Sequence, residues 1–262
     1  MPNVLLEKLD FNPLFEEALS LMEESDKNIL LTGRAGTGKS TLLEYFRSIT
    51  EKEVVVLAPT GVAAVNVSGQ TIHSFFRFLP DVTPEGVKRI GDPVYREIDA
   101  IVIDEISMVR ADLLDCIDRF LKLNGRVKNA PFGGIQMVFI GDLYQLPPVV
   151  RREEREFFKE RYGSEYFFDS DAFKSVPFEH MELEKVYRQT DESFIDLLNG
   201  VRNKSITDEE IELINGRYLA DETALPADAV HLTTTNAMAR ERNELELSKL
   251  KGKPYTFHAE VL

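Results

Sequence analysis

The chain contains 262 residues, 43% of them hydrophobic and 29% charged, a composition that is ordinary for one large or two small globular domains. Its 45 acidic and 31 basic residues give a net charge of −14, which argues against coating of duplex DNA by general attraction but leaves room for a narrow channel that grips a few phosphates. No apolar run approaches the roughly 18 residues of a membrane span, and no signal peptide is recognisable, so we expect a cytoplasmic protein that does not enter membranes.

Short apolar runs alternate with helical stretches along the first half of the chain. The runs are residues 28–31, 54–57, 100–103 and 136–140. Nearly continuous hydrophobicity of this kind is typical of strands that are buried on both faces, as in a parallel sheet. Between the last two runs, residues 113–117 look like part of an amphipathic helix in which Cys116 is an apolar member. The pattern predicts an α/β fold, a parallel sheet flanked by helices, with polar motifs at its carboxyl edge.

Residues 33–40 read G-R-A-G-T-G-K-S, a complete phosphate loop between the first strand and a helix. Glycines let the backbone turn tightly and aim several N–H groups at a polyphosphate, at the positive end of the following helix. We expect Lys39 to neutralise the β- and γ-phosphates and the Ser40 hydroxyl to hold Mg²⁺. A plain glycine turn would not explain why spacing, strand and helix agree. The candidate nucleotide-binding residues are Gly33, Ala35, Gly36, Thr37, Gly38, Lys39, Ser40 and Thr41.

Asp104 and Glu105 directly follow the third apolar run. An acidic pair at a strand end is often only solvated surface, but here a phosphate loop ends a strand of the same sheet. Asp104 is therefore the candidate Mg²⁺ ligand, acting through the ion's water shell, and Glu105 the candidate base that orients and deprotonates the attacking water.

Two further side chains are candidates for sensing or stabilising the γ-phosphate. Gln145 lies in the motif at 141–149, just beyond the fourth strand, where an amide could sense that group. A purely structural role, a rigid segment that leads away from the sheet, would account for Pro147 and Pro148 but not for Gln145. Arg188 could supply the positive charge that stabilises the transferring phosphoryl group, although an isolated arginine is more often a surface ion pair.

The pattern changes after the two prolines. Residues 151–166 read as a small solvated insertion, and another strand is indicated around 181–183. Helices are predicted at 193–198 and 208–215, the second with a capped start at Thr207. Strands are predicted at 230–234 and 255–257.

Six ordered motifs together resemble the superfamily-one helicases of the B branch, the Pif-one helicases and their RecD-like and Dda-like relatives. They are residues 33–40, 58–64, 69–75, 104–108, 141–149 and 186–189. The resemblance extends over nearly the whole chain, and Thr71-Ile72-His73-Ser74 is particularly typical of the Pif-one group.

This resemblance implies ATP-driven, 5′ to 3′ translocation of a monomer along single-stranded DNA, with ATP and Mg²⁺ as cofactors and junctions of single- and double-stranded DNA as partners. It implies that Thr60 and Gly61 contact DNA phosphates and that His73 lies in the adjoining DNA-side segment. A buried structural role for His73 stays open, and Phe75, Phe76 and Phe78 are assigned mainly to the core.

The resemblance also implies a division into domains. Residues 1–149 and 167–190 would form the first RecA-like motor domain, residues 150–166 a small wedge that parts the strands, and residues 191–262 part of a second motor domain. Later family motifs are missing after residues 233–236. We therefore expect the 262-residue chain to bind nucleotide but to unwind DNA poorly or not at all. Residues 11–18 also lack the glutamine that reads adenine in the family, which leaves ATP against GTP open.

Two other classes of protein remain as alternatives. One is a nucleotide-dependent switch that changes its affinity for DNA or protein without translocation. The other is an oligomeric ATPase of the AAA+ type, in which a neighbouring subunit supplies the arginine. Arg188, within the same chain, favours a monomeric motor over the second alternative.

Overall fold

The computed structural model describes residues 12–185, 187, 191–219, 225–226, 229–253 and 255–258, with the Glu192 side chain left out. The chain divides into two compact units, Met1–Ser205 and Ile206–Leu262, which are considered separately. Within the described residues, no helix combines the length and hydrophobicity needed to cross a bilayer.

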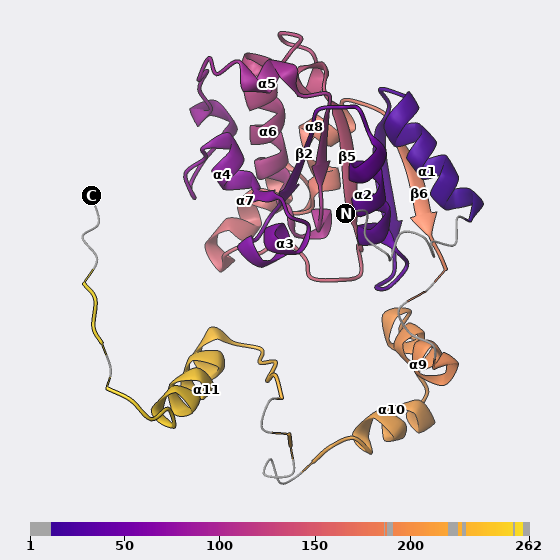
Figure 1. Ribbon diagram of the computed structural model, residues 1–262, viewed down its shortest axis with the longest axis vertical. Coiled ribbons are helices and arrows are strands. Elements are labelled where there is room, and N and C mark those ends of the chain that lie inside the picture. The colour runs from indigo at the N-terminus through magenta and orange to yellow at the C-terminus, as the bar shows by residue number, and fades with distance from the viewer. Residues whose placement is uncertain are drawn as a thin grey trace. The chain divides into compact units, whose positions relative to one another are not determined.

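The first unit is built on one six-stranded sheet (Figure 1). Its strands are β1 (Asn28–Gly33), β2 (Val54–Ala58), β3 (Gln70–Thr71), β4 (Ala100–Ile103), β5 (Gln136–Gly141) and β6 (Phe178–Leu183). They lie in the order β3-β2-β4-β5-β1-β6, and every neighbouring pair is parallel. The predicted α/β class is confirmed, as are the strands predicted within residues 28–183. The two-residue strand β3 was not predicted, because no apolar run marks it.

The central strands alternate between two cores because successive side chains on a strand point to opposite faces. Ile101 and Ile103 pack in one cluster, whereas Val102 between them packs in the other. All four residues of β4 are buried, as are all six of β5. This two-sided burial explains the uninterrupted apolar runs.

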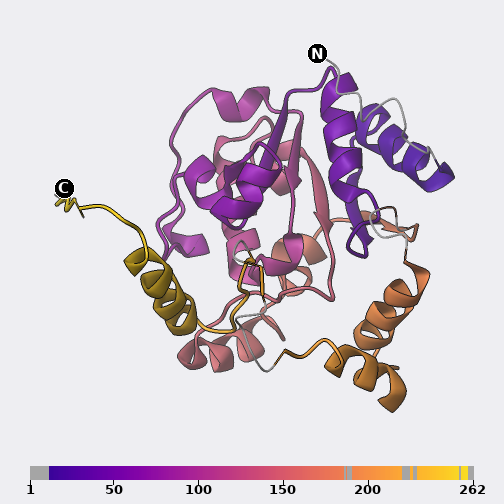
Figure 2. The ribbon, with the colours of Figure 1, turned by 60° about the horizontal axis from the view of Figure 1, so that its bottom comes forward.

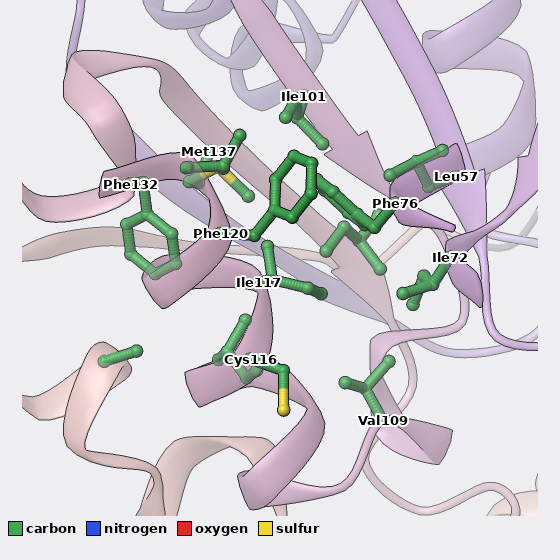
Figure 3. Close-up of a cluster of buried hydrophobic side chains, with 14 of the residues drawn as sticks. Leu57, Ile72, Phe76, Ile101, Val109, Cys116, Ile117, Phe120, Phe132 and Met137 are labelled. Carbon is green, nitrogen blue, oxygen red and sulfur yellow. The ribbon is translucent and has the colours of Figure 1, made fainter. Parts of the chain in front are cut away.

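Helices cover both faces of the sheet (Figure 1 and Figure 2). On one face lie α1 (Pro13–Glu24) and α2 (Lys39–Ile49), and on the other α4 (Ile72–Phe76) and α6 (Ala111–Asn124). Figure 3 shows Phe76, Ile117 and Phe120 in this second core. Phe76 and Phe120 meet edge to face with centroids 5.1 Å apart, so the core assignment of Phe76 is confirmed. Cys116 is fully buried in α6, where burial raises the pKa of its thiol to about 12.

Shorter elements complete the first unit. They are α3 (Gly61–Asn66), α5 (Val94–Glu97), α7 (Arg155–Arg161), α8 (Asp171–Lys174) and α9 (Glu192–Arg202), with 3₁₀ turns at Pro84–Gly86, Ile106–Met108, Pro131–Gly134, Arg152–Glu154 and Phe167–Asp169. The predicted helix at 193–198 is confirmed within α9. The insertion at 150–166 contains α7, and Phe158 of this helix and Tyr162 directly after it pack on Ala111.

The second unit contains α10 (Asp208–Asn215) and α11 (Asn236–Ser248). Thr207 and Glu210 form the predicted capping box of α10. The strands predicted at 230–234 and 255–257 are wrong, since those residues are irregular. A strand needs a neighbour for its backbone hydrogen bonds, and no strand occurs among the described residues of this unit. Leu232 and Phe257 are accordingly 95% and 91% exposed.

Candidate nucleotide-binding site

A cleft of about 400 Å³ opens at the carboxyl edge of the sheet. Its lining residues are Ala35, Gly36, Gly38, Lys39, Ser40, Thr41, Asp104, Glu105, Gln145 and Tyr187. Tyr187 follows β6 and the others follow β1, β4 and β5, four strands that lie next to one another in the sheet. The topology therefore brings together motifs that are more than a hundred residues apart in the chain.

The phosphate loop has the backbone conformation that its glycines predict. Gly36 and Gly38 have φ angles of 80° and 89°, in the left-handed region. Gly38 precedes α2 without a side-chain cap, so the first N–H groups of this helix remain available for an anion. Thr37 Oγ1 donates a hydrogen bond of 2.9 Å to the Arg34 carbonyl and braces the loop.

Lys39 points back into its own loop. Its Nζ donates to the carbonyl oxygens of Gly33 at 2.7 Å and Arg34 at 2.9 Å. Burial lowers the pKa of Lys39, and the nearby carboxylates of Asp142, Glu105 and Asp104 oppose that shift. The lysine is therefore partly desolvated and surrounded by acceptors before any phosphate arrives.

Asp104 and Glu105 face this lysine from the end of β4. Burial raises the pKa of Asp104, and burial together with the Asp104 charge raises the pKa of Glu105. Glu105 has φ 53° and ψ 43°, an uncommon left-handed conformation for a residue other than glycine. Two adjacent carboxyl groups thus sit in a partly dehydrated cleft that a cation would stabilise.

Gln145 reaches the cleft from the segment after β5. Its Nε2 donates to Asp142 Oδ2 at 3.1 Å, and Asp142 is only 2% exposed. Arg202 Nη1 of α9 donates to the same oxygen at 2.7 Å. Burial alone would raise the pKa of Asp142, but the hydrogen bonds from Arg202 and Gln145 lower it below its usual range.

Arg188 lies outside the described residues, and its catalytic role stays a prediction. Its neighbour Tyr187 lines the cleft, and the Tyr187 N–H donates to the Gly36 carbonyl at 2.8 Å. Sequence reasoning gave no role to Tyr187, Asp142 or Arg202. The position of Tyr187 within the motif at 186–189 was an available signal, whereas nothing local to α9 pointed to Arg202.

None of the predicted DNA-side residues lines this cleft. Thr60 and Gly61 follow β2, and β4 and β5 separate β2 from β1. Thr60 Oγ1 accepts the Ala63 N–H at 3.2 Å and caps α3, while the space around Gly61 is open. The DNA contacts of Thr60, Gly61 and His73 stay predictions.

His73 occupies a second groove, of about 420 Å³, which also contains Arg110, Arg151 and Phe157. Burial lowers the pKa of His73 and so favours the neutral imidazole. Because the side chain is half-buried yet lines a groove, the structure is compatible with both the structural and the DNA-side interpretation.

Comparison with known proteins agrees with the motifs. The family model described as PIF1-like helicase matches residues 11–212. The ATP-dependent DNA helicase PIF1 of Saccharomyces cerevisiae is 37% identical over 260 residues, which cover 93% of this chain and 29% of that protein. The human ATP-dependent DNA helicase PIF1 is 35% identical over 240 residues, covering 89% and 36% respectively. The chain thus spans about a third of the length of these curated relatives.

Solved structures give the same result. The Pif1 helicase from Bacteroides in complex with ADP-AlF3 and ssDNA has a TM-score of 0.82 and 34% identity, covering 94% of this chain and 59% of that chain. Bacteroides Pif1 bound to ssDNA has a TM-score of 0.81 and 35% identity, covering 92% and 57%. The P-loop NTPase fold and the predicted resemblance are confirmed, and the chain belongs to the PIF1-like helicase family.

Proposed function

We propose that this chain carries the ATP-hydrolysing core of a DNA helicase that moves 5′ to 3′ along single-stranded DNA. The observation that carries the proposal is the gathering of Lys39, Ser40, Asp104, Glu105 and Gln145 around one cleft. The names of the relatives support it, since they are called ATP-dependent DNA helicases and one was solved with ADP-AlF3 and ssDNA.

Each cleft residue has a distinct part in hydrolysis. Lys39 exchanges its bonds to the Gly33 and Arg34 carbonyls for bonds to the β- and γ-phosphates. Glu105 orients the attacking water and accepts its proton, and its raised pKa suits a base that works near neutral pH. Gln145 senses the γ-phosphate, and Arg188 adds positive charge as the phosphoryl group transfers.

Mg²⁺ fits the oxygen donors of the cleft. Ser40 and Asp104 both line it, and a hard cation that keeps several waters needs only one or two protein ligands beside the phosphates. When bound, Mg²⁺ neutralises charge on the phosphates. Burial raises the pKa of Asp104, and a backbone hydrogen bond at Glu105 and the Lys39 charge only partly oppose that shift, so a bound cation would stabilise the ionised carboxylate.

DNA would bind on the other half of the same edge, through Thr60, Gly61 and His73. Residues 150–166 would act as the wedge at a junction of single- and double-stranded DNA, and residues 191–262 would begin the second motor domain. We further propose a cytoplasmic monomer, since Arg188 of the same chain could supply the arginine that a ring-forming ATPase takes from a neighbouring subunit.

The decisive experiment is steady-state ATP hydrolysis by the 262-residue chain, with and without an unstructured single-stranded oligonucleotide. K39A and E105Q serve as inactive controls, and a parallel series with GTP measures base preference. Turnover that DNA stimulates and both substitutions abolish supports the motor core. Turnover that DNA leaves unchanged would instead favour a nucleotide-dependent switch.

A further inference from the structure

Helix α9 contacts two motifs of the nucleotide cleft from one of its faces. Arg34 Nη1 of the phosphate loop donates to Asn199 Oδ1 at 2.8 Å. Arg202 Nη1, three residues further along the helix, donates to Asp142 Oδ2 at 2.7 Å. Side chains three residues apart on a helix are neighbours, so a single face of α9 contacts both the phosphate loop and Asp142, the residue directly after β5.

The pair of Arg202 and Asp142 is removed from water. The two side chains are 16% and 2% exposed, and the Arg202 guanidinium stacks 4.1 Å from the centroid of the Tyr144 ring. Asp142 Oδ1 also accepts the Tyr144 N–H at 3.1 Å. A buried ion pair gives little net stability over an apolar packing, so stability alone does not account for this charged arrangement.

The same carboxylate fixes the end of Gln145 that faces the cleft. Asp142 Oδ2 accepts from Gln145 Nε2 at 3.1 Å. A carboxylate only accepts hydrogen bonds, so the NH₂ end of the amide must face Asp142. The second N–H of the Gln145 amide is thereby left to donate to a phosphate oxygen in the cleft, and its acceptor oxygen is left for water.

We propose that Arg202 is a positioning residue for ATP hydrolysis: it holds Asp142 in place, and Asp142 orients the amide of Gln145. The inference rests on the proposed function, because it takes Gln145 as the γ-phosphate sensor. Arg202 acts only through other side chains and does not touch the nucleotide. Its loss disturbs recognition of the γ-phosphate and leaves the site of the α- and β-phosphates intact.

The test compares two probes, AMP-PNP and ADP, which differ in the γ-phosphate group. Their dissociation constants are measured by calorimetry for the wild-type chain, R202A and R202K, together with kcat and KM for ATP. In R202A we expect binding of AMP-PNP to weaken about tenfold and kcat to fall about as much, the size expected for one lost charge-assisted hydrogen bond. Affinity for ADP changes by less than about twofold. R202K, which keeps the charge but not the planar fork, recovers part of the loss.

A matched control is R126A, which removes another arginine–aspartate pair, with Asp99, next to the amino end of β4. R126A should leave the ratio of the two affinities unchanged. If R202A does not fold, the double variant R202Q/D142N removes both buried charges, and the same loss of discrimination is expected. If R202A or the double variant folds and keeps the wild-type ratio of AMP-PNP to ADP affinity, the role of Arg202 is disproved. The proposed motor function is unaffected by that result. A wild-type chain that binds neither probe overturns the proposed function itself.

Discussion

Lys39 donates a hydrogen bond of 2.7 Å to the carbonyl oxygen of Gly33, six residues before it. The lysine therefore closes back on the loop that would hold the phosphates, and its charge is already balanced by loop carbonyls and by Asp142, Glu105 and Asp104. Binding of a polyphosphate replaces weaker neutral acceptors by charged ones, which favours release of the lysine towards the ligand.

The first prediction concerns that exchange. K39A should weaken the binding of ATP by roughly tenfold to a hundredfold, since about 1.5–3 kcal/mol is typical of a hydrogen bond to a charged group. Calorimetric titration of nucleotide measures the effect. Lys52 is a matched control, because its Nζ also donates to two carbonyls, of Met22 and Ser25, but away from the cleft. K52A should lower the melting temperature and leave nucleotide affinity unchanged; equal loss of affinity in both variants would contradict the assignment of Lys39.

The second prediction is the pH dependence of turnover. Glu105 must be deprotonated to act as a base, and burial beside Asp104 raises its pKa above the ordinary value of 4.5. Hydrolysis should therefore be lost on acidification at a higher pH than for an ordinary glutamate. A profile of kcat against pH checks this. E105Q should reduce kcat by roughly 10²- to 10⁴-fold with nucleotide binding retained, and a variant that keeps the wild-type kcat would show that another group is the base.

The third prediction is that removing the charge of Glu105, which impairs turnover, stabilises the fold. Because the folded state raises the pKa of Glu105, the ionised carboxylate destabilises the fold above that pKa, and the penalty disappears as pH falls through it. A neutral glutamine imitates the protonated form. E105Q without Mg²⁺ or nucleotide should therefore raise the melting temperature at pH 7, by roughly 2 °C if the relief is near 1 kcal/mol. E51Q, at an exposed position, is the control, and lower stability of E105Q would refute the unfavourable environment.

The fourth prediction contrasts Gly33, at the end of β1, with Gly61, at the start of α3. A Cβ on Gly33 would lie 2.6 Å from both the Leu183 carbonyl and Thr37 Oγ1, whereas Gly61 has open space around it. G33A should destabilise the chain by about 1–3 kcal/mol and impair nucleotide binding. G61A, in the first turn of α3, should be neutral or stabilising by up to about 1 kcal/mol. Denaturant titration of both variants decides the matter, and equal stabilities would contradict the packing of the loop on β6.

The fifth prediction concerns the attachment of residues 150–166. Arg110 donates to Asp112 and Glu154 and stacks 4.7 Å from the centroid of Phe158. R110A should expose this segment to proteolysis and hydrogen exchange, with a local loss of about 1–3 kcal/mol. R161A removes an exposed pair with Asp171 and a cation–π contact with the Tyr162 ring, and it should expose the segment less than R110A does. Equal protection of the segment in wild type and R110A would show that Phe158 and Tyr162 suffice to hold it.

The sheet was predictable because its signal is local. Each run such as 100–103 is apolar throughout, since β4 lies inside the sheet with helices on both faces. The carboxyl-edge rule then placed Asp104, Glu105 and Gln145 beside the phosphate loop, and the cleft confirms their proximity.

Other features depend on partners that the local sequence does not show. Residues 230–234 have β-branched composition, but strand propensity forms no strand without a neighbouring strand. Helix α11 escaped prediction because its apolar residues are sparse, and its best signal was the cap by Thr235, whose side chain accepts the Met238 N–H. Arg202 reaches Asp142 across sixty residues, a contact that only tertiary packing reveals.

The turn that contains Glu105 packs directly against Gly141, so the two segments constrain each other sterically. A Cβ at Gly141 would lie 2.9 Å from Ile106 Cγ2 and 3.2 Å from the Ile106 nitrogen, within the turn that holds Glu105 at positive φ. The turn after β4 therefore fits only against a bare backbone at the end of β5. Anyone who grafts an acidic motif from another ATPase into this scaffold must transfer the facing glycine with it, because the two segments form one exchangeable unit rather than two.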